Sequence, residues 1–592
     1  MRRSILALAA ILLLAPLAPQ PASADESAVR WREFTDAVFE QAARENKYVL
    51  LHMAAVWCHW CHVMERTTYR DPAVLKLIGE RYIPVRVDQD SRPDLSYRYE
   101  RWGWPATIMF DKDGNEIFRR QGYQPPELFA KLLQAVIDDP SALPAASVEP
   151  EVDPTLTRLA PERRAEMERD YLAHYDATNG GFGDVHRFLH QESIEYALTR
   201  VGEGDPWRDI ARRTLDGARL LIDPVEGGMF QYSDSHDWRS AHYEKLMNIQ
   251  LAAARLYGQA YGKWRDARDL ASVGDIARWL RQTMHGPDGA FYASQDADVS
   301  ADIHGKDYYG APAAKRRELG QPRIDRSLYT RENGWAVSAL AAHYDVSSDA
   351  KSLAAAETAA RWLLANRQAP NHAFGHARAS NNDIYLADTL AAGEAFLALY
   401  RSTGDREWLE HAGNAGRALA NQFADPKGGF VAQWPMVGAR GALAKPVKQV
   451  DENVAATRFL NLLHRHLGDV VFREGAKLGL AWLVALGNQG MILPGVLLAE
   501  NELAQEPVHL TVVGAKDDAA AARLYQVARA HPERYLRIEW WDRREGPLPN
   551  NEIEYPELDR PAAFACSASF CSLPAFDASE IAERIAAVSR RP

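Results

Sequence analysis

Two cysteines separated by two residues constrain this chain more than any other feature. They lie in the stretch Trp57-Cys58-His59-Trp60-Cys61-His62, and the 592 residues contain only four cysteines. The preceding run, Tyr48–Ala54, is short, apolar and rich in strand-forming residues, while residues 61–68 continue without glycine or proline, as a helix can. The sequence therefore predicts a buried strand, a turn that carries the cysteines, and a helix.

The position of the cysteines at the start of a helix predicts a reactive thiol. Unpaired N–H groups and the positive end of the helix dipole stabilise a thiolate there. We expect Cys58, the more N-terminal and more exposed thiol, to be the attacking nucleophile, and Cys61 to be the resolving partner that closes the disulfide. A positive charge on His59 would stabilise the reduced form and make the disulfide a stronger oxidant.

Three other interpretations of this stretch stay open. Cys58-x-x-Cys61-His62 matches the attachment pattern of a c-type haem, with His62 as axial ligand. The cysteines with His59 or His62 could hold zinc, although no second ligand pair follows at metal-finger spacing. The pair could also be an inert structural disulfide. A redox dithiol is the preferred interpretation, and with it we expect no cofactor and no bound metal ion.

Residues downstream predict the rest of a small α/β domain. Strands are expected at residues 83–88, 106–110 and 116–119, and a closing helix at 126–137. Pro105 stands directly before the middle one of these strands, where a cis Trp104–Pro105 bond would place backbone beside the dithiol to pair with a substrate strand. The alternative is an ordinary trans proline in a loop. We expect Trp57, Trp60 and Trp104 to contact the substrate.

Residues of about 30 to 140 resemble a thioredoxin fold. The motifs that carry a closer resemblance are Cys58-His59-Trp60-Cys61-His62-Val63-Met64, Val87-Asp88, Arg92-Pro93-Asp94 and Gly103-Trp104-Pro105. In this order they are similar to those of the thioredoxin-domain family formerly described as of unknown function, which includes spermatogenesis-associated protein 20. One difference from ordinary thioredoxins is His52. The resemblance leads us to expect a buried acid at this position, which would deprotonate the second thiol. The direction of any redox reaction therefore stays open.

The N-terminal residues predict export. Residues 1–24 combine Met1-Arg2-Arg3, an apolar run at 5–14 and Ala22-Ser23-Ala24, which is the pattern of a cleaved secretory signal. The apolar run, of about ten residues, is too short to span a bilayer. Removing residues 1–24 changes the net charge from 69 − 80 = −11 to 67 − 80 = −13. An acidic chain without a basic run argues against nucleic acid or anionic lipid as a partner. We expect a periplasmic or secreted protein without a membrane span.

From residue 162 to about residue 487 nearly every segment has a helical pattern, and glycine-aromatic turns recur between the helices. These turns are Gly180-Gly181-Phe182, Gly227-Gly228-Met229-Phe230, Gly289-Ala290-Phe291, Phe374-Gly375 and Gly428-Gly429-Phe430. Repeated helix pairs joined by similar turns indicate stacked hairpins, and about a dozen helices favour a closed α/α toroid over an open solenoid. We expect a thioredoxin-like domain at residues 25–140, a linker at 141–161 and the toroid at 162–503.

This second region resembles the remainder of the same family and, more loosely, six-hairpin glycosidases and N-acylglucosamine 2-epimerases. The matching residues are His242-Tyr243-Glu244-Lys245-Leu246, Asp296-Ala297-Asp298, Asn333-Gly334, Tyr385 with Asp388, and Asn453-Val454-Ala455-Ala456. All stand at helix ends or in turns, where the central cavity of a toroid would collect them. His242, Glu244, Asp296 and Asp298 are candidates for binding a sugar or transferring its protons. The alternatives are a non-catalytic docking cavity, or carboxylates that only brace loops.

Residues 504–592 predict a small α/β cap, with strands at 508–514, 536–541 and 561–565 and helices at 519–530 and 577–588. Cys566 and Cys571 would lie up to about 17 Å apart in an extended segment, so a disulfide between them requires a turn. We favour a structural disulfide, with a redox relay or free thiols as alternatives. The fold class expected for the chain is multidomain α+β: a thioredoxin-like α/β domain, an (α/α)6 toroid and a C-terminal α/β cap.

Two functional hypotheses follow from the sequence. The preferred one is an exported thiol-disulfide oxidoreductase that uses Cys58 and Cys61, assisted by Pro105, on a protein client. A redox partner would regenerate the dithiol, and the toroid would recruit or present a partner. The alternative is a toroid that binds or acts on carbohydrate, with the redox domain as an accessory.

Overall fold

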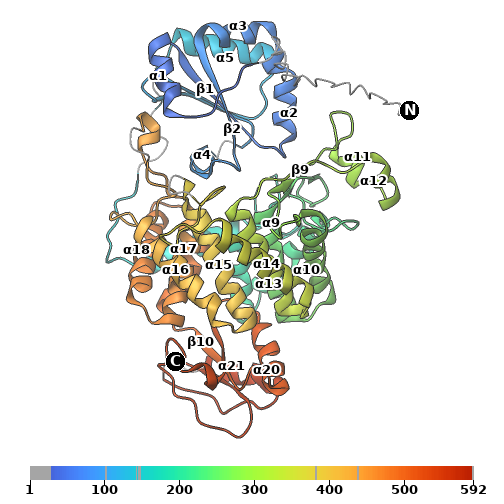
Figure 1. The fold of residues 1–592 in the computed structure, drawn as a ribbon, viewed down its shortest axis with the longest axis vertical. Coiled ribbons are helices and arrows are strands. Elements are labelled where there is room, and N and C mark those ends of the chain that lie inside the picture. The colour runs from blue at the N-terminus through green and yellow to red at the C-terminus, as the bar shows by residue number, and fades with distance from the viewer. Residues whose placement is uncertain are drawn as a thin grey trace, which may run out of the picture.

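The computed structural model describes residues 29–99, 103–141, 143, 149–183, 185–379, 383–435, 439–567 and 569–589. Three parts follow one another along the longest axis: an N-terminal α/β domain, a ring of helices, and a C-terminal α/β cap (Figure 1). The expected signal peptide lies outside the described residues, as does part of the expected linker. No helix in the described ranges is both long and apolar enough to cross a membrane.

The N-terminal domain is a four-stranded sheet with helices on both faces (Figure 1). Its elements are α1 (Asp36–Glu45), β1 (Tyr48–Ala54), α2 (His59–Arg66), α3 (Pro72–Arg81), β2 (Tyr82–Asp88), α4 (Pro93–Tyr99), β3 (Ala106–Phe110), β4 (Glu116–Gln121) and α5 (Pro126–Asp138). The strand order is β2-β1-β3-β4, with β2 parallel to β1 and both other pairs antiparallel. The four strands and α5 agree with the sequence analysis, which does not predict α1, α3 and α4.

Strand β1 is apolar apart from His52 because both faces of the sheet are covered. One core contains Phe39 of α1 and Leu95 of α4, and the other contains Ile78 of α3 and Leu133 of α5. A strand covered on both faces reads as a continuous apolar run instead of an alternating one. The end of β1 is thereby fixed in the core, and the turn that carries Cys58 starts from a rigid support.

The middle of the molecule is built from α-helices joined by long loops with short strands. The helices are α6 (Pro161–Ala173), α7 (Gln191–Thr199), α8 (Trp207–Ala218), α9 (Met247–Trp264), α10 (Ala267–Trp279), α11 (Gly305–Tyr309), α12 (Ala313–Leu319), α13 (Thr330–Ser347), α14 (Ala350–Asn366), α15 (Leu386–Thr403), α16 (Arg406–Gln422), α17 (Val450–Leu467), α18 (Val470–Gly487) and α19 (Pro494–Ala504). The strands are β5 (Tyr232–Ser233), β6 (Ala241–His242), β7 (Lys245–Leu246), β8 (Ser294–Gln295) and β9 (Ile324–Asp325).

The contacts between these helices close a ring. The inner helix α7 touches α9, α9 touches α13, and the series continues through α15, α17 and α19 back to α7. Outer helices pack against the inner ones in the pairs α7–α8, α9–α10, α13–α14, α15–α16 and α17–α18. Gly334 of α13 permits a close approach, because a Cβ there would lie 2.6 Å from the backbone of Ala391 in α15. The toroid expected from the repeats is therefore present.

Amide side chains of the inner helices hold the glycine-aromatic turns in place. Asn333 of α13 accepts a hydrogen bond from the backbone N–H of Phe291 at 2.7 Å and donates one to its carbonyl at 3.0 Å. Asn453 of α17 makes the same two bonds with Phe430, at 2.6 and 2.9 Å. Buried backbone groups need such partners. Asn333 and Asn453 therefore have a structural role in the ring.

The cap contains β10 (Val508–Val513), α20 (Ala519–Arg529), β11 (Leu536–Trp541), β12 (Ala562–Cys566) and α21 (Ile581–Ser589). β10 is parallel to β11 and antiparallel to β12. The cap packs on the ring through contacts of α13 with α20 and of α15 and α17 with β11. A turn in which Ser567 N–H donates to the Phe570 carbonyl at 2.8 Å brings Cys566 and Cys571 together, and they form a disulfide. The turn that the sequence analysis requires for this bond is thus observed.

Candidate functional site

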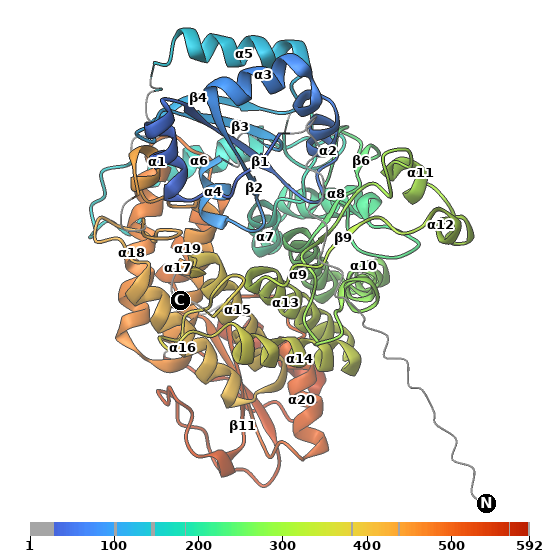
Figure 2. The same ribbon diagram turned by 45° about the horizontal axis from the view of Figure 1, so that its top comes forward.

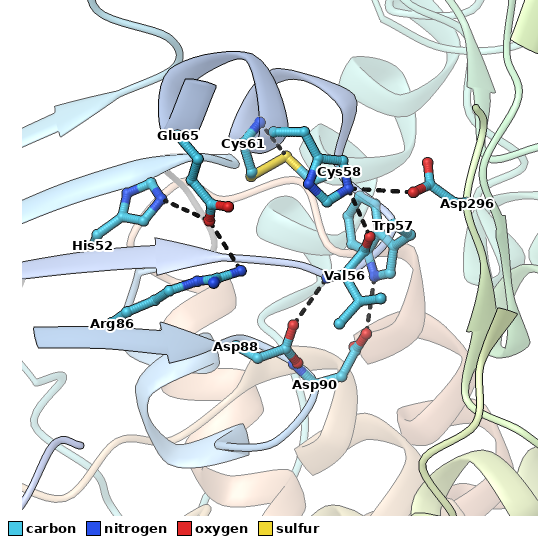
Figure 3. Close-up of a disulfide and its surroundings, with 11 residues drawn as sticks. His52, Val56, Trp57, Cys58, Cys61, Glu65, Arg86, Asp88, Asp90 and Asp296 are labelled. Carbon is cyan, nitrogen blue, oxygen red and sulfur yellow. Dashed lines mark hydrogen bonds and ion pairs between the residues drawn. A yellow bond between two sulfur atoms is a disulfide. The ribbon is translucent and has the colours of Figure 1, made fainter. Parts of the chain in front are cut away.

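Cys58 and Cys61 form a disulfide at the start of α2 (Figure 3). Cys58 is the N-cap residue of this helix, and the backbone N–H of Cys61 points at Cys58 Sγ from 3.1 Å. An N–H aimed at sulfur stabilises a thiolate when the disulfide opens. The Trp104–Pro105 peptide bond is cis. In this disulfide form neither sulfur is free to attach a haem or to ligate zinc.

The disulfide is buried between the N-terminal domain and the ring. Cys58 and Cys61 are 4% and 1% exposed. Trp104 packs against them from the N-terminal domain, and Leu246 of β7 packs against them from the ring. Cys58 is the more exposed of the two, as expected, but only slightly, because the ring covers this end of α2.

Both histidines of the motif contact aspartates of the ring. His59 Nδ1 lies 2.5 Å from Asp298 Oδ2, and His62 Nε2 lies 3.2 Å from Asp296 Oδ2 and 2.9 Å from the carbonyl oxygen of Val56. The hydrogen bond to Asp296 raises the pKa of His62 despite its burial. In two views α2 lies beside the ring segment that leads to α11 (Figures 1 and 2), and His304 of this segment lies edge-on to His59 at 5.4 Å.

The ring residues singled out from the sequence lie on one rim, next to the disulfide. The antiparallel pairing of β7 with β8 brings Glu244 and Asp296, which border these strands, to the same edge. His242 stacks on Tyr232 at 4.2 Å, and its Nε2 lies 2.7 Å from Asp234. His242 Nδ1 lies 3.6 Å from Glu244 Oε2. The rim therefore holds these residues in ion pairs, and two of its carboxylates contact the CxxC motif.

The central cavity of the ring is separate from the rim that contacts the CxxC motif. It has a volume of about 190 Å³ and lies against the cap, with His531 and Leu536 of the cap in its wall. Its charged lining includes Arg255, Asp345, Glu394, Arg401, Arg458 and Glu502. The sequence analysis expects the cavity to collect His242, Glu244, Asp296 and Asp298, but none of them lines it. The loops that carry them face the N-terminal domain instead, because that domain covers this end of the ring.

His52 occupies the position at which a buried acid is expected. Burial lowers the pKa of His52 to about 3, with Arg86 adding to the effect, so the imidazole is neutral. A carboxylate is nevertheless close, because Glu65 Oε1 lies 3.8 Å from His52 Nε2 and 2.9 Å from Arg86 (Figure 3). Glu65 follows Cys61 by four positions in α2, so both lie on one face of the helix. The sequence analysis does not single out Glu65, although this spacing is visible in the sequence.

The three tryptophans of the site lie in different environments. Trp57 is 5% exposed, and its indole N–H donates to Asp90 Oδ2 at 2.9 Å. Trp104 packs against the disulfide. Trp60 is 48% exposed and lies 5.7 Å from the ring of Tyr123. Of these three side chains, Trp60 is the one that offers a large open surface to a substrate.

Three aspartates meet below the turn that precedes Cys58. Asp88 and Asp90 follow β2, Asp325 ends β9 of the ring, and one carboxylate oxygen of each lies within 4.8 Å of the others. Burial raises the pKa of Asp88 to about 6, and the charge of Asp325 contributes to the shift. Burial also raises the pKa of Asp90, with Asp88 as a second cause. These acidic side chains could hold a metal ion.

The N-terminal domain is a thioredoxin-like redox domain, as its four-stranded sheet, its helix-capping cysteine and its CxxC turn together show. Residues 19–138 match the family model Thioredox_DsbH, described as "Protein of unknown function, DUF255". Through this domain the chain belongs to the thioredoxin-like family of that description.

Known proteins align with two regions of the chain. Thioredoxin H7 of Arabidopsis thaliana is 33% identical over 112 residues, which cover 18% of this chain and 78% of that protein. Spermatogenesis-associated protein 20 of Mus musculus is 25% identical over 311 residues, which cover 46% of this chain and 39% of that protein. This chain thus spans about two fifths of the length of that relative. The structure of cellobiose 2-epimerase from Bacillus thermoamylovorans aligns with 54% of this chain and 85% of that chain, with a TM-score of 0.42 and 11% identity.

Proposed function

We propose that the protein is a thiol-disulfide oxidoreductase and that Cys58 and Cys61 are its reacting residues. The observation that carries this proposal is the disulfide at the N-terminus of α2, with the Cys61 N–H directed at Cys58 Sγ. This arrangement stabilises Cys58 as a thiolate, which is the form that attacks or leaves in thiol-disulfide exchange.

The reaction that follows is an exchange of one disulfide for another. A substrate thiolate attacks Cys58 Sγ, the Sγ–Sγ bond breaks, and its electron pair leaves on Cys61. A second substrate thiolate then attacks the substrate sulfur of the mixed disulfide and releases Cys58 as a thiolate. The substrate is oxidised to a disulfide and the protein is reduced to a dithiol; the reverse sequence reduces a substrate disulfide.

We assign to Glu65 the acceptance of the proton that Cys61 loses when it attacks a mixed disulfide. A buried histidine whose pKa is near 3 is too weak a base to accept this proton at neutral pH, so His52 does not take this role. Glu65 shares a helix face with Cys61 and is held by Arg86 at 2.9 Å. In this proposal the acid that ordinary thioredoxins carry on a strand is replaced by one on α2.

We assign to the ring the positioning of the client. Its rim contacts the motif through Asp296 and Asp298, whereas its central cavity lies toward the cap. Trp60 remains open beside the disulfide and offers an aromatic surface to a protein chain. The signal pattern in residues 1–24 supports action outside the cytoplasm, where disulfides persist.

The alternative of sugar chemistry at this rim receives no support from the contacts. Asp296 and Asp298, which would have to transfer protons, are engaged by His62 and His59. Despite its burial, Asp298 has a lowered pKa because of its hydrogen bond with His59, whereas burial raises the pKa of Asp296. Neither carboxylate lines the central cavity, where a sugar would have room to bind. We therefore propose no glycosidase or epimerase reaction at these residues.

The test is disulfide exchange with a small aromatic disulfide as substrate. Cys58→Ser should lower the rate by at least about a hundredfold, because it removes the nucleophile. Cys571→Ser, which breaks the other disulfide, is the matched control and should keep the wild-type rate. A Cys58→Ser rate equal to that of the control would refute the proposal. A Cys61→Ser variant should retain clients as mixed disulfides, and identifying them would show the direction of the reaction.

A further inference from the structure

The three aspartates below the CxxC turn, Asp88, Asp90 and Asp325, form a group that the redox reaction does not use. We call them the acidic trio. Two come from the N-terminal domain and one from the ring, and each places a carboxylate oxygen within 4.8 Å of the other two. Asp90 and Asp325 are 7% and 8% exposed. Buried like charges at this separation repel strongly unless a cation lies between them.

The side chains around the trio do not supply enough positive charge. Within the described ranges, the ion pair that reaches the trio is that of Arg331, whose Nη2 lies 3.7 Å from Asp90 Oδ1, and this guanidinium is bound more closely by Glu332 at 2.6 Å. The ion pairs of the described residues include none with Asp88 or Asp325. Counting the trio and Glu332 against Arg331 gives a formal charge of 1 − 4 = −3.

One oxygen of the trio also lacks a hydrogen-bond partner. Oδ2 of Asp325 is buried and has no donor among the described residues, while Oδ1 accepts from the Ser327 N–H at 3.0 Å. Leaving a buried carboxylate oxygen without a partner is costly. Because an oxygen of this carboxylate lies within 4.8 Å of an oxygen of Asp88 and of Asp90, a cation held by all three would also offset the buried charge of Asp325.

The trio keeps free acceptor capacity for such an ion. Asp90 accepts one hydrogen bond from Trp57 and one from Gln89, one on each oxygen. Asp88 Oδ2 accepts from the Val56 N–H at 2.9 Å. Because each carboxylate oxygen has two lone pairs, one acceptor site on each of these oxygens remains for a cation. The existing bonds fix the carboxylates in place, as supporting hydrogen bonds do in metal sites.

We propose that Asp88, Asp90 and Asp325 bind one hard divalent cation, Ca²⁺ in preference to Mg²⁺, at the junction of the N-terminal domain and the ring. Ca²⁺ takes oxygen ligands at about 2.3–2.6 Å in flexible geometry, and three carboxylate oxygens within 4.8 Å of one another can all reach one such ion. Mg²⁺ keeps several water molecules and demands a near-ideal octahedron. A buried group of carboxylates from two domains therefore suits Ca²⁺ better.

The ion would connect the ring to the turn that leads into Cys58. Asp88 holds the backbone of Val56, and Asp90 holds the indole of Trp57, the residue before Cys58. Asp325 ends β9, which pairs with β8 directly before Asp296. Binding one ion to all three carboxylates thus fixes the CxxC turn and the ring relative to each other.

The experiment titrates Ca²⁺ and Mg²⁺ into the chelator-treated full-length protein, using calorimetry and thermal unfolding. We expect one Ca²⁺ per chain and a rise in Tm, with Mg²⁺ binding more weakly. Asp325→Asn should bind Ca²⁺ at least about tenfold more weakly, because affinity follows the number of charged ligands. Asp302→Asn changes an exposed aspartate of the same ring region and should bind as the wild type does.

A second measurement needs no variant of the trio, in case Asp325→Asn does not fold. Tb³⁺ replaces Ca²⁺ in oxygen sites, and the indole of Trp57, bonded to Asp90, would transfer excitation energy to it. Luminescence should appear at one Tb³⁺ per chain, fall when Ca²⁺ is added, and weaken in Trp57→Phe. The inference is overturned if the wild type shows neither calcium-dependent heat nor this luminescence, if Mg²⁺ binds more tightly, or if Asp325→Asn binds Ca²⁺ as the wild type does. If protons instead of a metal ion relieve the repulsion among the three acids, neither Ca²⁺ nor Tb³⁺ should give a signal, and Asp325→Asn should raise the Tm.

Discussion

The two disulfides of this chain lie in contrasting surroundings. Cys58–Cys61 caps a helix, and the two histidines of its motif are paired with Asp296 and Asp298. Cys566–Cys571 joins the end of β12 to a short turn. Its neighbours are apolar and aromatic, namely Leu548, Tyr555, Ala562 and Phe564.

The surroundings of a disulfide, more than the spacing of its cysteines, decide its chemistry. Both disulfides have apolar neighbours, which disfavour a thiolate, but the first also has the Cys61 N–H directed at Cys58 Sγ and the positive end of α2, which stabilise one. The first disulfide is therefore placed for exchange, whereas the second is placed to hold a turn. Four predictions test this comparison.

The largest effect is expected for Glu65, the proposed acceptor of the Cys61 thiol proton. Glu65→Gln should slow the step in which Cys61 resolves a mixed disulfide by about a hundredfold, the usual range for loss of general base catalysis. Rapid mixing followed by acid quench and thiol alkylation measures this step. The control is Glu80→Gln, an exposed glutamate on α3. Equal rates for the two variants would remove Glu65 from the mechanism.

The second disulfide should matter for stability and not for exchange. Cys571→Ser should lower the free energy of unfolding of the cap by about 2 kcal/mol, the cost of opening a loop this short. Hydrogen exchange of the β12 amides reports this local change. The double variant Cys566→Ser/Cys571→Ser should lose no more than the single one, since both remove the same bond. A loss of exchange activity in either would show that the cap disulfide takes part in the reaction.

The two disulfides should open at different potentials. In glutathione redox buffers, Cys58–Cys61 should be reduced first, at a potential at least about 30 mV higher, which corresponds to a tenfold difference in equilibrium constant. The reason is that the Cys61 N–H and the positive end of α2 favour the Cys58 thiolate. Alkylation followed by mass spectrometry distinguishes the pairs. Reduction of both disulfides at the same potential would show that the difference in their surroundings does not affect their redox chemistry.

The smallest effect concerns the contact between His62 and Asp296. Because Asp296 raises the pKa of His62, this pair stabilises the folded protein fully below the ordinary histidine pKa of about 6.5 and loses its contribution as pH rises through the raised pKa. Asp296→Asn should therefore lower the free energy of unfolding by about 1 kcal/mol at pH 6 and by less at pH 8.5. Denaturant unfolding at both pH values measures the difference. A loss that is the same at both would mean that His62 is neutral in the pair.

Local sequence patterns determine much of the fold. The apolar run of β1, the proline before β3 and the glycine turns of the ring each depend on neighbouring residues, and the structure has the strands and helices where these patterns predict them. The position of Cys58 at the start of α2 also follows from local sequence, since the break between strand and helix is visible there.

The surroundings of the reacting sulfurs are decided only by the tertiary structure. His59 meets Asp298 across 239 positions of the chain, and Leu246 covers the disulfide from the ring. Asp325 lies close to Asp88 because the N-terminal domain docks on one end of the ring. Periodicity tells which face of an element is buried, but not which distant surface will cover it. The sequence alone therefore identifies the dithiol, and the docking of two domains determines what it touches.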